Sequence, residues 1–382
     1  MTKLIGKAAD AFEAGSMSSD VDNRLGDFLM DKFTEIVDNE IKNYDSSSAK
    51  KLDTVELKRL FYGLFLMRCK RENIKNGCEN LFDVSLRNFS AYKECKGYGY
   101  VELKSGFGPV IDAMIGSHKE KLHERIYLNH YLKMIYLSPE LRDTEVNLFG
   151  RRSNHAKYTS DPRKAVLRVC DRTDPKAPKD KIIVCDRVLC TMSLGYLKEN
   201  LNHLVEPLSF VSEEKRLAVM RVGFGLINKV YLYYDKPFWS EKVKLINLVW
   251  LPADPNSFRA DKIKHENDVT PNWIDQVCKF EVVHSQRNCL SAWIAGHAYF
   301  EKLDERVVEN ELTNLLRQFL NDPKIPLPNR MVRTKWQSNK YTRGTYSLLT
   351  LGSKPSDLKI LAEPIPKEVL LQFFFFISKY IF

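Results

Sequence analysis

A chain of 382 residues is too long for one simple hydrophobic core, and its length indicates two domains or one large domain. The apolar fraction of 44% and the aromatic fraction of 11% exclude a largely disordered chain. Lysine and arginine give a net charge of +10, but acidic residues lie among most of the basic clusters, so we expect no nucleic-acid partner.

The first hundred residues have the apolar periodicity of helices. From Asp22 to Tyr44, apolar residues recur at three- and four-residue steps, which predicts an amphipathic helix. A second helix is expected over Leu52–Cys69, and we expect it to be buried because it is apolar on most of its circumference. The polar run DSSSAKK, residues 45–51, predicts a linker between them.

Strand-like runs begin in the next part of the chain, after a short helix expected over Gly108–Ile115. The runs cover Ile126–Leu137, Ala165–Cys170 and Lys181–Thr191. The polar, turn-rich stretches Arg151–Arg163 and DRTDPKAPKD, residues 171–180, predict exposed hairpin loops.

Helices and strands mix irregularly in the second half. Short helices are expected over Leu194–Leu201 and Ser212–Met220. Strands are expected over Asn228–Tyr234, Lys244–Trp250, Lys279–Val283 and Cys289–Ile294. The clearest helix is Asp304–Leu320, with Asp304 as its N-cap and one apolar face made of Val307, Val308, Leu312, Leu315, Leu316 and Phe319. Because no regular βαβ alternation occurs, the expected fold class is α+β.

Several site types are excluded by missing motifs. The sequence contains neither G-x-G-x-x-G nor G-x-x-x-x-G-K, so it has no glycine loop for phosphates. Its eight cysteines form no C-x-x-C, so we expect no metal site and reduced thiols. The N-terminus lacks the apolar core of a signal peptide, and the apolar stretch Val369–Phe382 is shorter than the about 20 residues that span a bilayer. We therefore expect no membrane span and a cytoplasmic location.

Four stretches carry more specific information. They are Leu86–Ile115, Cys185–Leu201 with the following Ser212–Trp239, Cys289–Trp336, and Ser338–Pro366. In this order and spacing they resemble the flavin-containing amine oxidases, closest to the animal spermine oxidases and acetylpolyamine oxidases. The resemblance covers roughly residues 23–366 and is loose through 125–181. It implies FAD as cofactor, oxygen as co-substrate, and oxidation of spermine, spermidine or acetylated forms to an aldehyde, a shorter amine and hydrogen peroxide.

Lys229 is the catalytic candidate. From strand alternation alone, Lys229 in GLINKVYLYY would lie on a solvated face. The family motif G-x-x-x-K-(I/V)-x-L-x-(F/Y) carries at this position a lysine that holds a water beside the reactive nitrogen of the flavin. The resemblance therefore implies that Lys229 assists reoxidation of the flavin, where its ammonium favours the reduced, anionic form.

The segment WQSNKYTRGTY supplies the candidate aromatic residues. In isolation, Trp336 and Tyr346 would be two core aromatics that flank a loop. The segment matches the family pattern W-x-x-x-x-Y-x-R-G-(S/T)-Y-S, which makes Trp336 a wall of the flavin site and Tyr346 one side of the slot that orients the substrate amine. Tyr341, also in the pattern, is a second substrate-binding candidate. An aromatic face suits a cationic substrate, because it attracts a cation by about 0.5 to 2 kcal/mol.

Three further residues are assigned to the cofactor by the resemblance. MSLGYLKENL resembles a family segment that approaches the nucleotide side of the flavin, which places Met192 and Ser193 near the cofactor, although Ser193 is equally well placed to cap a helix. Leu132 aligns with a residue whose backbone meets the adenine.

The resemblance also implies a domain organisation. It comprises an N-terminal extension (1–22), the helical part of a substrate domain (23–104), a partial FAD-binding domain with a β-hairpin insertion (105–200), the mixed sheet and helix of the substrate domain (201–335), a loop facing flavin and substrate (336–366), and an unrelated apolar tail (367–382). Family members begin with a glycine fingerprint and end with a G-E-(A/T)-T-(H/S) segment, and neither occurs here, nor does a peroxisomal C-terminal tripeptide. We therefore expect an incomplete Rossmann-like domain. A catalytically inactive paralogue, or a splice or gene-model product that cannot hold FAD, stays open as the alternative.

Overall fold

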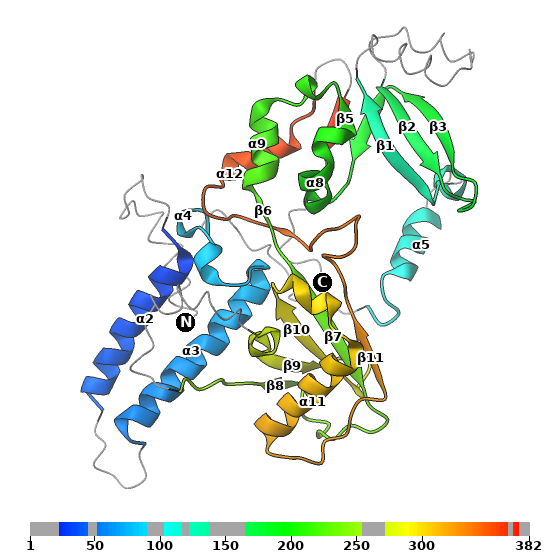
Figure 1. The fold of residues 1–382 in the computed structure, drawn as a ribbon. Helices are drawn as coiled ribbons and strands as arrows, with labels where there is room; N and C mark the ends of the chain where they lie inside the picture. Colours follow the sequence, from blue (N-terminus) through cyan, green and yellow to red (C-terminus); the bar gives the residue numbers. More distant parts are fainter. Residues whose placement is uncertain are drawn as a thin grey trace. The chain divides into compact units, whose positions relative to one another are not determined.

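The structure is a computed structural model that describes residues 23–44, 52–89, 103–116, 122–137, 165–253 and 272–365, and the backbone of 370–373. These residues fall into two compact units. Unit 1 takes its residues from Met1–Lys96 and Arg221–Pro355, and unit 2 from Gly97–Met220 and Ser356–Phe376. Both units contain helices and sheets (Figure 1), and the predicted α+β class is confirmed.

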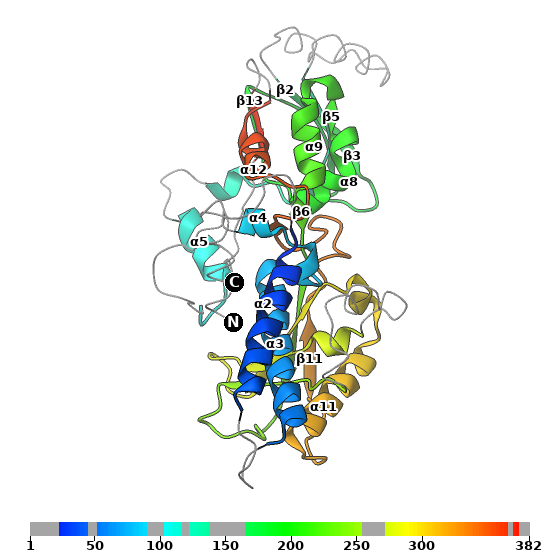
Figure 2. The same ribbon diagram turned by 90° about the vertical axis from the view of Figure 1, so that its left-hand side faces the viewer.

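Unit 1 begins with two long helices, α2 (Leu25–Lys42) and α3 (Thr54–Asn76), which lie side by side in Figures 1 and 2. Phe33 of α2 stacks on Phe65 of α3 with ring centroids 4.1 Å apart. The Asp53 side chain caps α3 by accepting the Glu56 N–H (2.7 Å), and the helix ends at Gly77 in the left-handed region. Both helices were expected, but α3 runs further than its apolar pattern.

The expectation that this second helix is buried is wrong. Its exposed apolar side chains are Val55 (50% exposed), Leu60 (38%) and Leu64 (41%). A helix that is apolar nearly all round is normally enclosed on all sides, whereas α3 packs only part of its surface against described neighbours.

The main sheet of unit 1 has the strand order β11-β7-β10-β9-β8, and every neighbouring pair is antiparallel. The strands are β7 (Ile227–Tyr233), β8 (Leu245–Asn247), β9 (Lys279–Val282), β10 (Cys289–Ala295) and β11 (Arg330–Arg333). Four of the five were expected, and β8 is shorter than the apolar run Lys244–Trp250. The fifth, β11, gives no alternating pattern because it is a polar edge strand.

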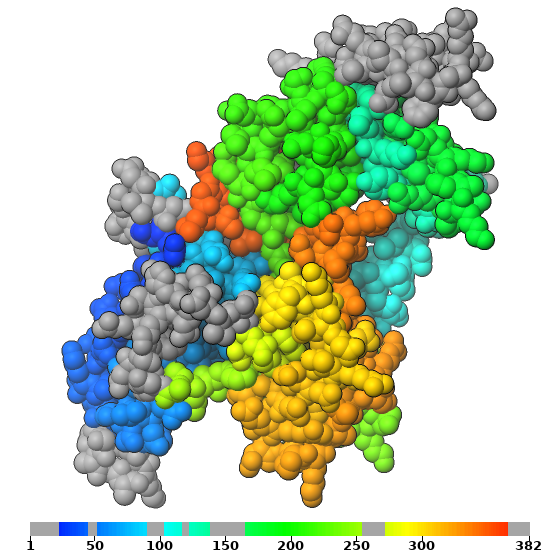
Figure 3. All heavy atoms as spheres, viewed as in Figure 1, coloured from blue at the N-terminus to red at the C-terminus, as the bar shows by residue number. Residues whose placement is uncertain are grey.

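Helix α11 (Glu305–Leu320) covers one face of this sheet. Its buried Val308, Leu312, Leu315 and Leu316 pack in one core with Val230, Leu232, Phe280, Leu290, Ala292 and Ile294 of the strands. In Figure 3 the yellow and orange atoms of this part form one continuous surface. Asp304 is the N-cap, as predicted, and accepts the Arg306 N–H (2.8 Å). Val307 was expected on the apolar face but is 45% exposed.

The remaining elements of unit 1 are short. They are η1 (Leu81–Asp83), α4 (Leu86–Phe89), η4 (Trp273–Gln276), η5 (Ala298–Lys302), and the two-stranded pair of β6 (Gly223–Phe224) and β12 (Ser347–Leu348).

Unit 2 is built on a four-stranded sheet of order β3-β2-β1-β5. Its strands are β1 (His130–Tyr136), β2 (Ala165–Asp171), β3 (Lys179–Cys185) and β5 (Val205–Glu206); β1 and β5 are parallel and the other pairs antiparallel. β4 (Arg187–Cys190) pairs in parallel with β13 (Leu370–Phe373). The predicted hairpin at 171–180 joins β2 to β3. The predicted run Lys181–Thr191 is two strands rather than one, because the chain leaves β3 at Asp186.

The helical elements of unit 2 are α5 (Gly108–Gly116), η2 (Leu122–Arg125), α8 (Leu194–Leu204), η3 (Leu208–Phe210), α9 (Glu213–Arg221) and α12 (Pro355–Ala362). The predicted helices at 108–115, 194–201 and 212–220 are confirmed. Lys215 of α9 is buried, and its ammonium donates to the carbonyls of Ile360, Leu361 and Glu363 at the end of α12. A helix end leaves carbonyls without partners, and this lysine binds three of them.

Some expectations fall outside the described residues: the extension 1–22, the linker 45–51, the loop 151–163 and most of the tail 367–382. Within the part of the chain that is described, no helix combines the length and apolarity needed to cross a bilayer. The seven described cysteines are all free thiols.

Candidate active site

Lys229 lies in the middle of β7, the second strand of the unit 1 sheet. Successive residues of a strand point to opposite faces, and the buried Val230 and Leu232 point to the core under α11. Lys229 therefore lies on the opposite face, where α3 packs and where its side chain is half-buried.

The cross-strand partner of Lys229 is Trp293 of β10. The Lys229 ammonium lies over the Trp293 ring, with Nζ 3.9 Å from the ring centroid. Lys279 of β9 approaches the same ring at 5.6 Å and forms an ion pair with Glu281. An aromatic face attracts a cation within about 6 Å of its centroid, so the ring holds the Lys229 charge at a fixed place on the sheet. Sequence reasoning did not single out Trp293, because only the strand register brings it beside Lys229.

The segment after β11 continues beside β7. The Thr334 N–H donates to the Lys229 carbonyl (3.0 Å), and the Lys229 N–H donates to Thr334 Oγ1 (2.9 Å). Thr334 Oγ1 in turn donates to the Asn228 side-chain oxygen (3.1 Å). These bonds attach the start of the Trp336–Tyr346 loop to the residue pair that includes Lys229.

The Trp336–Tyr346 loop folds back on itself and onto β6. The Gly344 N–H and the Thr342 hydroxyl both donate to the Trp336 carbonyl (3.2 and 2.7 Å). A Cβ at Gly344, whose φ is +144°, would lie 2.5 Å from the Phe224 ring, and one at Gly225 would lie 2.3 Å from the Gly77 carbonyl oxygen. The two glycines are therefore required for the close approach of three segments.

Tyr346 is buried (6% exposed) on the same face as Lys229. It belongs to a cluster with Ile74, Ile227, Cys278 and Ala295, against which Trp293 packs. Its hydroxyl donates to the Ile74 carbonyl, and also approaches that of Lys75 (3.3 Å), at the C-terminal end of α3. The structure thus brings Tyr346 and Lys229 to one face of the sheet, but the tyrosine hydroxyl is used by the helix end.

The other aromatic candidates of unit 1 are more accessible. Trp336 is half-buried at the start of the loop, and Tyr341 is 51% exposed at its tip, where Lys340 lies 5.0 Å from its ring.

A buried carboxylate that sequence reasoning missed lies at the root of this loop. Glu301 of η5 is 4% exposed and accepts three hydrogen bonds: from the Asn228 side-chain amide (2.9 Å), the Gln337 N–H (2.9 Å) and the Ser338 N–H (2.7 Å). Burial alone would raise the pKa of Glu301, but the hydrogen bonds from Gln337, Ser338 and Asn228 outweigh it and hold that pKa below its usual value. No sequence motif marks this residue.

The three remaining candidates lie in unit 2. Leu132 is on β1, opposite Val169 of β2, where the register shifts by one residue. Met192 is half-buried between β4 and α8. Ser193 caps α8, with its hydroxyl accepting the Tyr196 N–H (3.0 Å), as the capping alternative expects.

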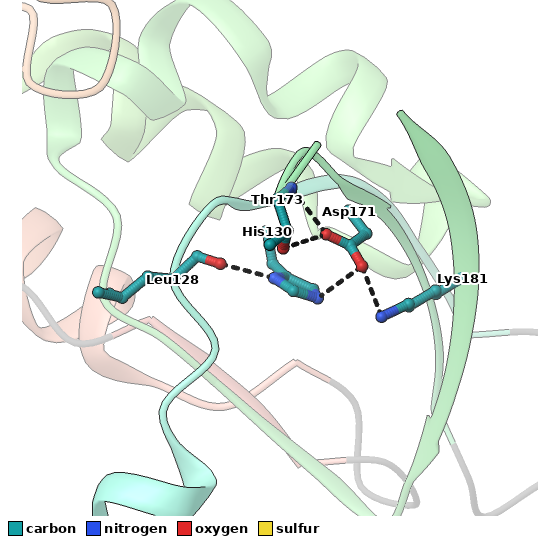
Figure 4. A network of polar contacts seen from close by, with 5 residues as sticks. All are labelled: Leu128, His130, Asp171, Thr173 and Lys181. Atoms are coloured by element: carbon teal, nitrogen blue, oxygen red, sulfur yellow. Dashed lines mark hydrogen bonds and ion pairs between the residues drawn. The ribbon is translucent and has the colours of Figure 1, made fainter. Parts of the chain in front are cut away.

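Unit 2 also contains the polar network drawn in Figure 4. Asp171 accepts from Lys181 (2.6 Å) and from the Thr173 N–H (2.9 Å), and His130 lies 3.7 Å from it. The other His130 ring nitrogen lies 2.8 Å from the Leu128 carbonyl oxygen. The Lys181 ammonium, with Thr173, holds the pKa of Asp171 well below its usual range. Because the carboxylate is bound by its own hairpin, we assign this network to fixing β1, β2 and β3.

Thiol and metal chemistry find little support among the described residues. Burial raises the pKa of Cys69 to about 12 and that of Cys289 to about 11, so neither is an activated nucleophile. No cluster of three or more histidine, cysteine, aspartate or glutamate side chains suited to a metal occurs in the described part of the chain.

The residues on the Lys229 face fit the ring end of a flavin. They offer a fixed ammonium and the aromatic side chains of Trp293 and Tyr346, which suit a planar ring system that becomes anionic on reduction. They offer nothing for the diphosphate end. In the described residues of unit 2, β4 is joined to α8 by Thr191, Met192 and Ser193, and the Ser193 hydroxyl accepts the Tyr196 N–H at the start of that helix.

Comparison with known proteins gives consistent results. Residues 40–377 match the family model described as flavin containing amine oxidoreductase. The human peroxisomal N(1)-acetyl-spermine/spermidine oxidase is 33% identical over 185 residues, which are 47% of this chain and 35% of that protein. Histone demethylase-like protein A of Aspergillus fumigatus is 30% identical over 258 residues, 66% of this chain and 22% of that protein. The matched regions thus span about a third or less of these relatives.

The fold also resembles solved structures. A redesigned putrescine oxidase superposes with a TM-score of 0.50 at 13% identity, covering 93% of this chain and 71% of that one. The cofactor of the matched family is a flavin. With a family model that matches most of its length, this chain belongs to the flavin containing amine oxidoreductase family.

Proposed function

We propose that this chain acts in the flavin-dependent oxidation of polyamines such as spermine, spermidine or their acetylated forms. The observation that carries the proposal is the Lys229 ammonium, held over the Trp293 ring on a half-buried sheet face that also holds Tyr346. A fixed cation beside aromatic residues is what a reaction that generates negative charge on a ring requires. Oxygen as co-substrate and a cytoplasmic location are part of the proposal.

The bonds that break in polyamine oxidation define what the residues must do. A C–H bond next to the amine nitrogen would break, and its hydride would leave the substrate. Bound FAD would supply the redox chemistry, taking up the hydride and transferring its electron pair to oxygen, which is released as hydrogen peroxide. Water then adds to the C=N bond of the oxidised substrate, which splits into an aldehyde and a shorter amine. Lys229 would hold a water molecule and provide a positive charge near the site of reduction. Trp336 would exclude bulk water from one side.

The substrate is cationic, which suits the aromatic candidates. Tyr341 is 51% exposed, and its ring already has the Lys340 ammonium 5.0 Å from its centroid, which is the kind of contact an alkylammonium group would make. Tyr346 would take part through its ring, because its hydroxyl is bound to the end of α3. For unit 2, we propose that Leu132, Met192 and Ser193 contact the nucleotide part of the cofactor.

A second candidate is a chain that keeps the fold but does not bind FAD. The start of α8 favours it, because the Ser193 hydroxyl already accepts the Tyr196 N–H there and a diphosphate would need backbone amides of this kind. Such a chain would have no redox activity of its own.

Visible absorption of the purified full-length chain after incubation with FAD and removal of free flavin separates the two candidates. Retained flavin bands that bleach on addition of a polyamine without oxygen support the oxidase. No retained flavin supports the second candidate, and retained flavin that no polyamine reduces overturns polyamine oxidation. Lys229→Met should slow reoxidation by oxygen more than tenfold while leaving the bleaching step largely intact. Lys242→Met, an exposed lysine of the same unit, is the matched control.

A further inference from the structure

Glu301 connects two segments that are distant in the sequence and carry the candidate site. One carboxylate oxygen accepts from the Asn228 side chain and the Gln337 N–H, and the other accepts from the Ser338 N–H. Asn228 immediately precedes Lys229 on β7, and Gln337 immediately follows Trp336.

The carboxylate is itself held in place. Arg333 of β11 donates to the Phe300 carbonyl (3.0 Å) and to the Leu303 carbonyl, on either side of Glu301 in sequence. The three donors to the Glu301 carboxylate are the Asn228 side chain and two successive backbone amides, so the orientation of the carboxylate is set from two directions. A carboxylate this well bonded is charged, and hydrogen bonds to a charged acceptor are stronger than those to a neutral one.

The loop needs this acceptor. β11 ends at Arg333, and beyond Thr334 the chain leaves the sheet, so the Gln337 and Ser338 N–H groups have no strand partner. Gln337 is half-buried and Ser338 is exposed, and in both cases the N–H donates to the buried Glu301 carboxylate.

We propose that Glu301 is a positioning residue: its carboxylate fixes the start of the Trp336–Tyr346 loop against the strand that carries Lys229. It lies on the α11 side of the sheet, opposite Lys229, and acts through the Asn228 side chain and the Gln337 backbone rather than by touching cofactor or substrate. The claim that this loop faces the flavin rests on the proposed function; the claim that Glu301 fixes the loop does not.

The test is native-state amide hydrogen exchange of the full-length chain without flavin. In Glu301→Gln, an NH₂ group takes the place of one carboxylate oxygen. It cannot accept a hydrogen bond, so at least one of the donors that bind Glu301 loses its partner. We expect the Gln337 and Ser338 amides to exchange at least tenfold faster, with β10 amides changed less than twofold. Glu311→Gln, an exposed glutamate of α11, should leave all of these rates unchanged. Leu316→Ala, in the core under the same sheet, should instead accelerate loop and β10 amides together.

A second measurement reports on Trp336 directly. The difference in emission between a chain and its Trp336→Phe partner isolates one of the five tryptophans. In the Glu301→Gln background this difference spectrum should shift to longer wavelength, because the indole gains contact with water. Unchanged exchange at Gln337 and Ser338, an equal acceleration at β10, or an unshifted Trp336 spectrum each overturn the inference. None of these results depends on flavin, so failure of the oxidase proposal would be seen separately, in the absorption experiment.

Discussion

The contact between Lys229 and Trp293 should contribute a measurable coupling free energy, about 1 kcal/mol. The ammonium lies 3.9 Å from the ring centroid and the lysine is half-buried. Cation–π contacts are worth about 0.5 to 1 kcal/mol at exposed sites and about 2 when desolvated, so a half-buried pair falls between these limits. A coupling of 1 kcal/mol changes an opening equilibrium by a factor of about five.

A double-mutant cycle measures this coupling. The variants are Lys229→Met, Trp293→Leu and the double variant, since methionine keeps the length of lysine without its charge. Loss of the indole also removes packing against the Tyr346 cluster. This lost packing free energy is the same with and without Lys229, so it cancels when the coupling free energy is calculated. The readout is the free energy of opening of unit 1, from amide exchange of unmutated β10 residues in the full-length chain.

Lys279 provides the internal comparison. It lies further from the ring (5.6 Å) and is paired with Glu281, so its coupling to Trp293 should be only a few tenths of a kcal/mol. A coupling for Lys229 indistinguishable from zero, or smaller than that for Lys279, would refute the placement of the Lys229 charge on which the proposed function depends.

Three further predictions concern stability. Burial lowers the pKa of His297 despite the nearby Glu79 and Asp275, so as the pH falls the unfolded chain binds a proton at this residue before the folded chain does. Unit 1 should therefore lose stability as the pH falls below about 6.5. His297→Asn, which suits the left-handed backbone (φ +54°), should make unfolding curves depend less on pH. Asp304→Ala should cost about 1 kcal/mol in denaturant unfolding through loss of the α11 cap, whereas Glu305→Ala should cost less. Leu316→Ala should cost about 2 to 5 kcal/mol, because the side chain is completely buried; a cost below 1 would contradict the assigned core.

Much of the fold could be predicted because its determinants are local. The apolar face of α11 and its Asp304 cap lie in one continuous segment, Asp304–Leu320, and the structure contains them almost as expected. Val307 lies at the border of that face, where a periodic pattern does not decide between core and solvent. The exposed apolar side chains of α3 show the same limit, since a pattern reports how apolar a helix is but not what covers it.

The candidate site could be predicted only in part, because its contacts are long-range. The motif identified Lys229, Trp336 and Tyr346 by analogy, but the ring under Lys229 belongs to β10 and is set by the β7–β10 register. Tyr346 was expected to form one side of a substrate slot, and the bond from its hydroxyl to the Ile74 carbonyl depends on where α3 ends. Neither contact leaves a mark in the local sequence.

Glu301 illustrates why a functional support can be invisible in a sequence. In FEKLDE it resembles any surface glutamate, and it is buried only because donors from β7 and from the loop after Trp336 converge on it. An apolar side chain in its place could press the loop on the sheet, but apolar packing is non-directional and would leave the Gln337 and Ser338 amides unpaired. A carboxylate with two acceptor oxygens satisfies both amides and Asn228 at once, and it does so in one register of the loop. The main effect of Glu301 is therefore to set the position of Trp336 relative to Lys229, and its effect on the free energy of unfolding is secondary.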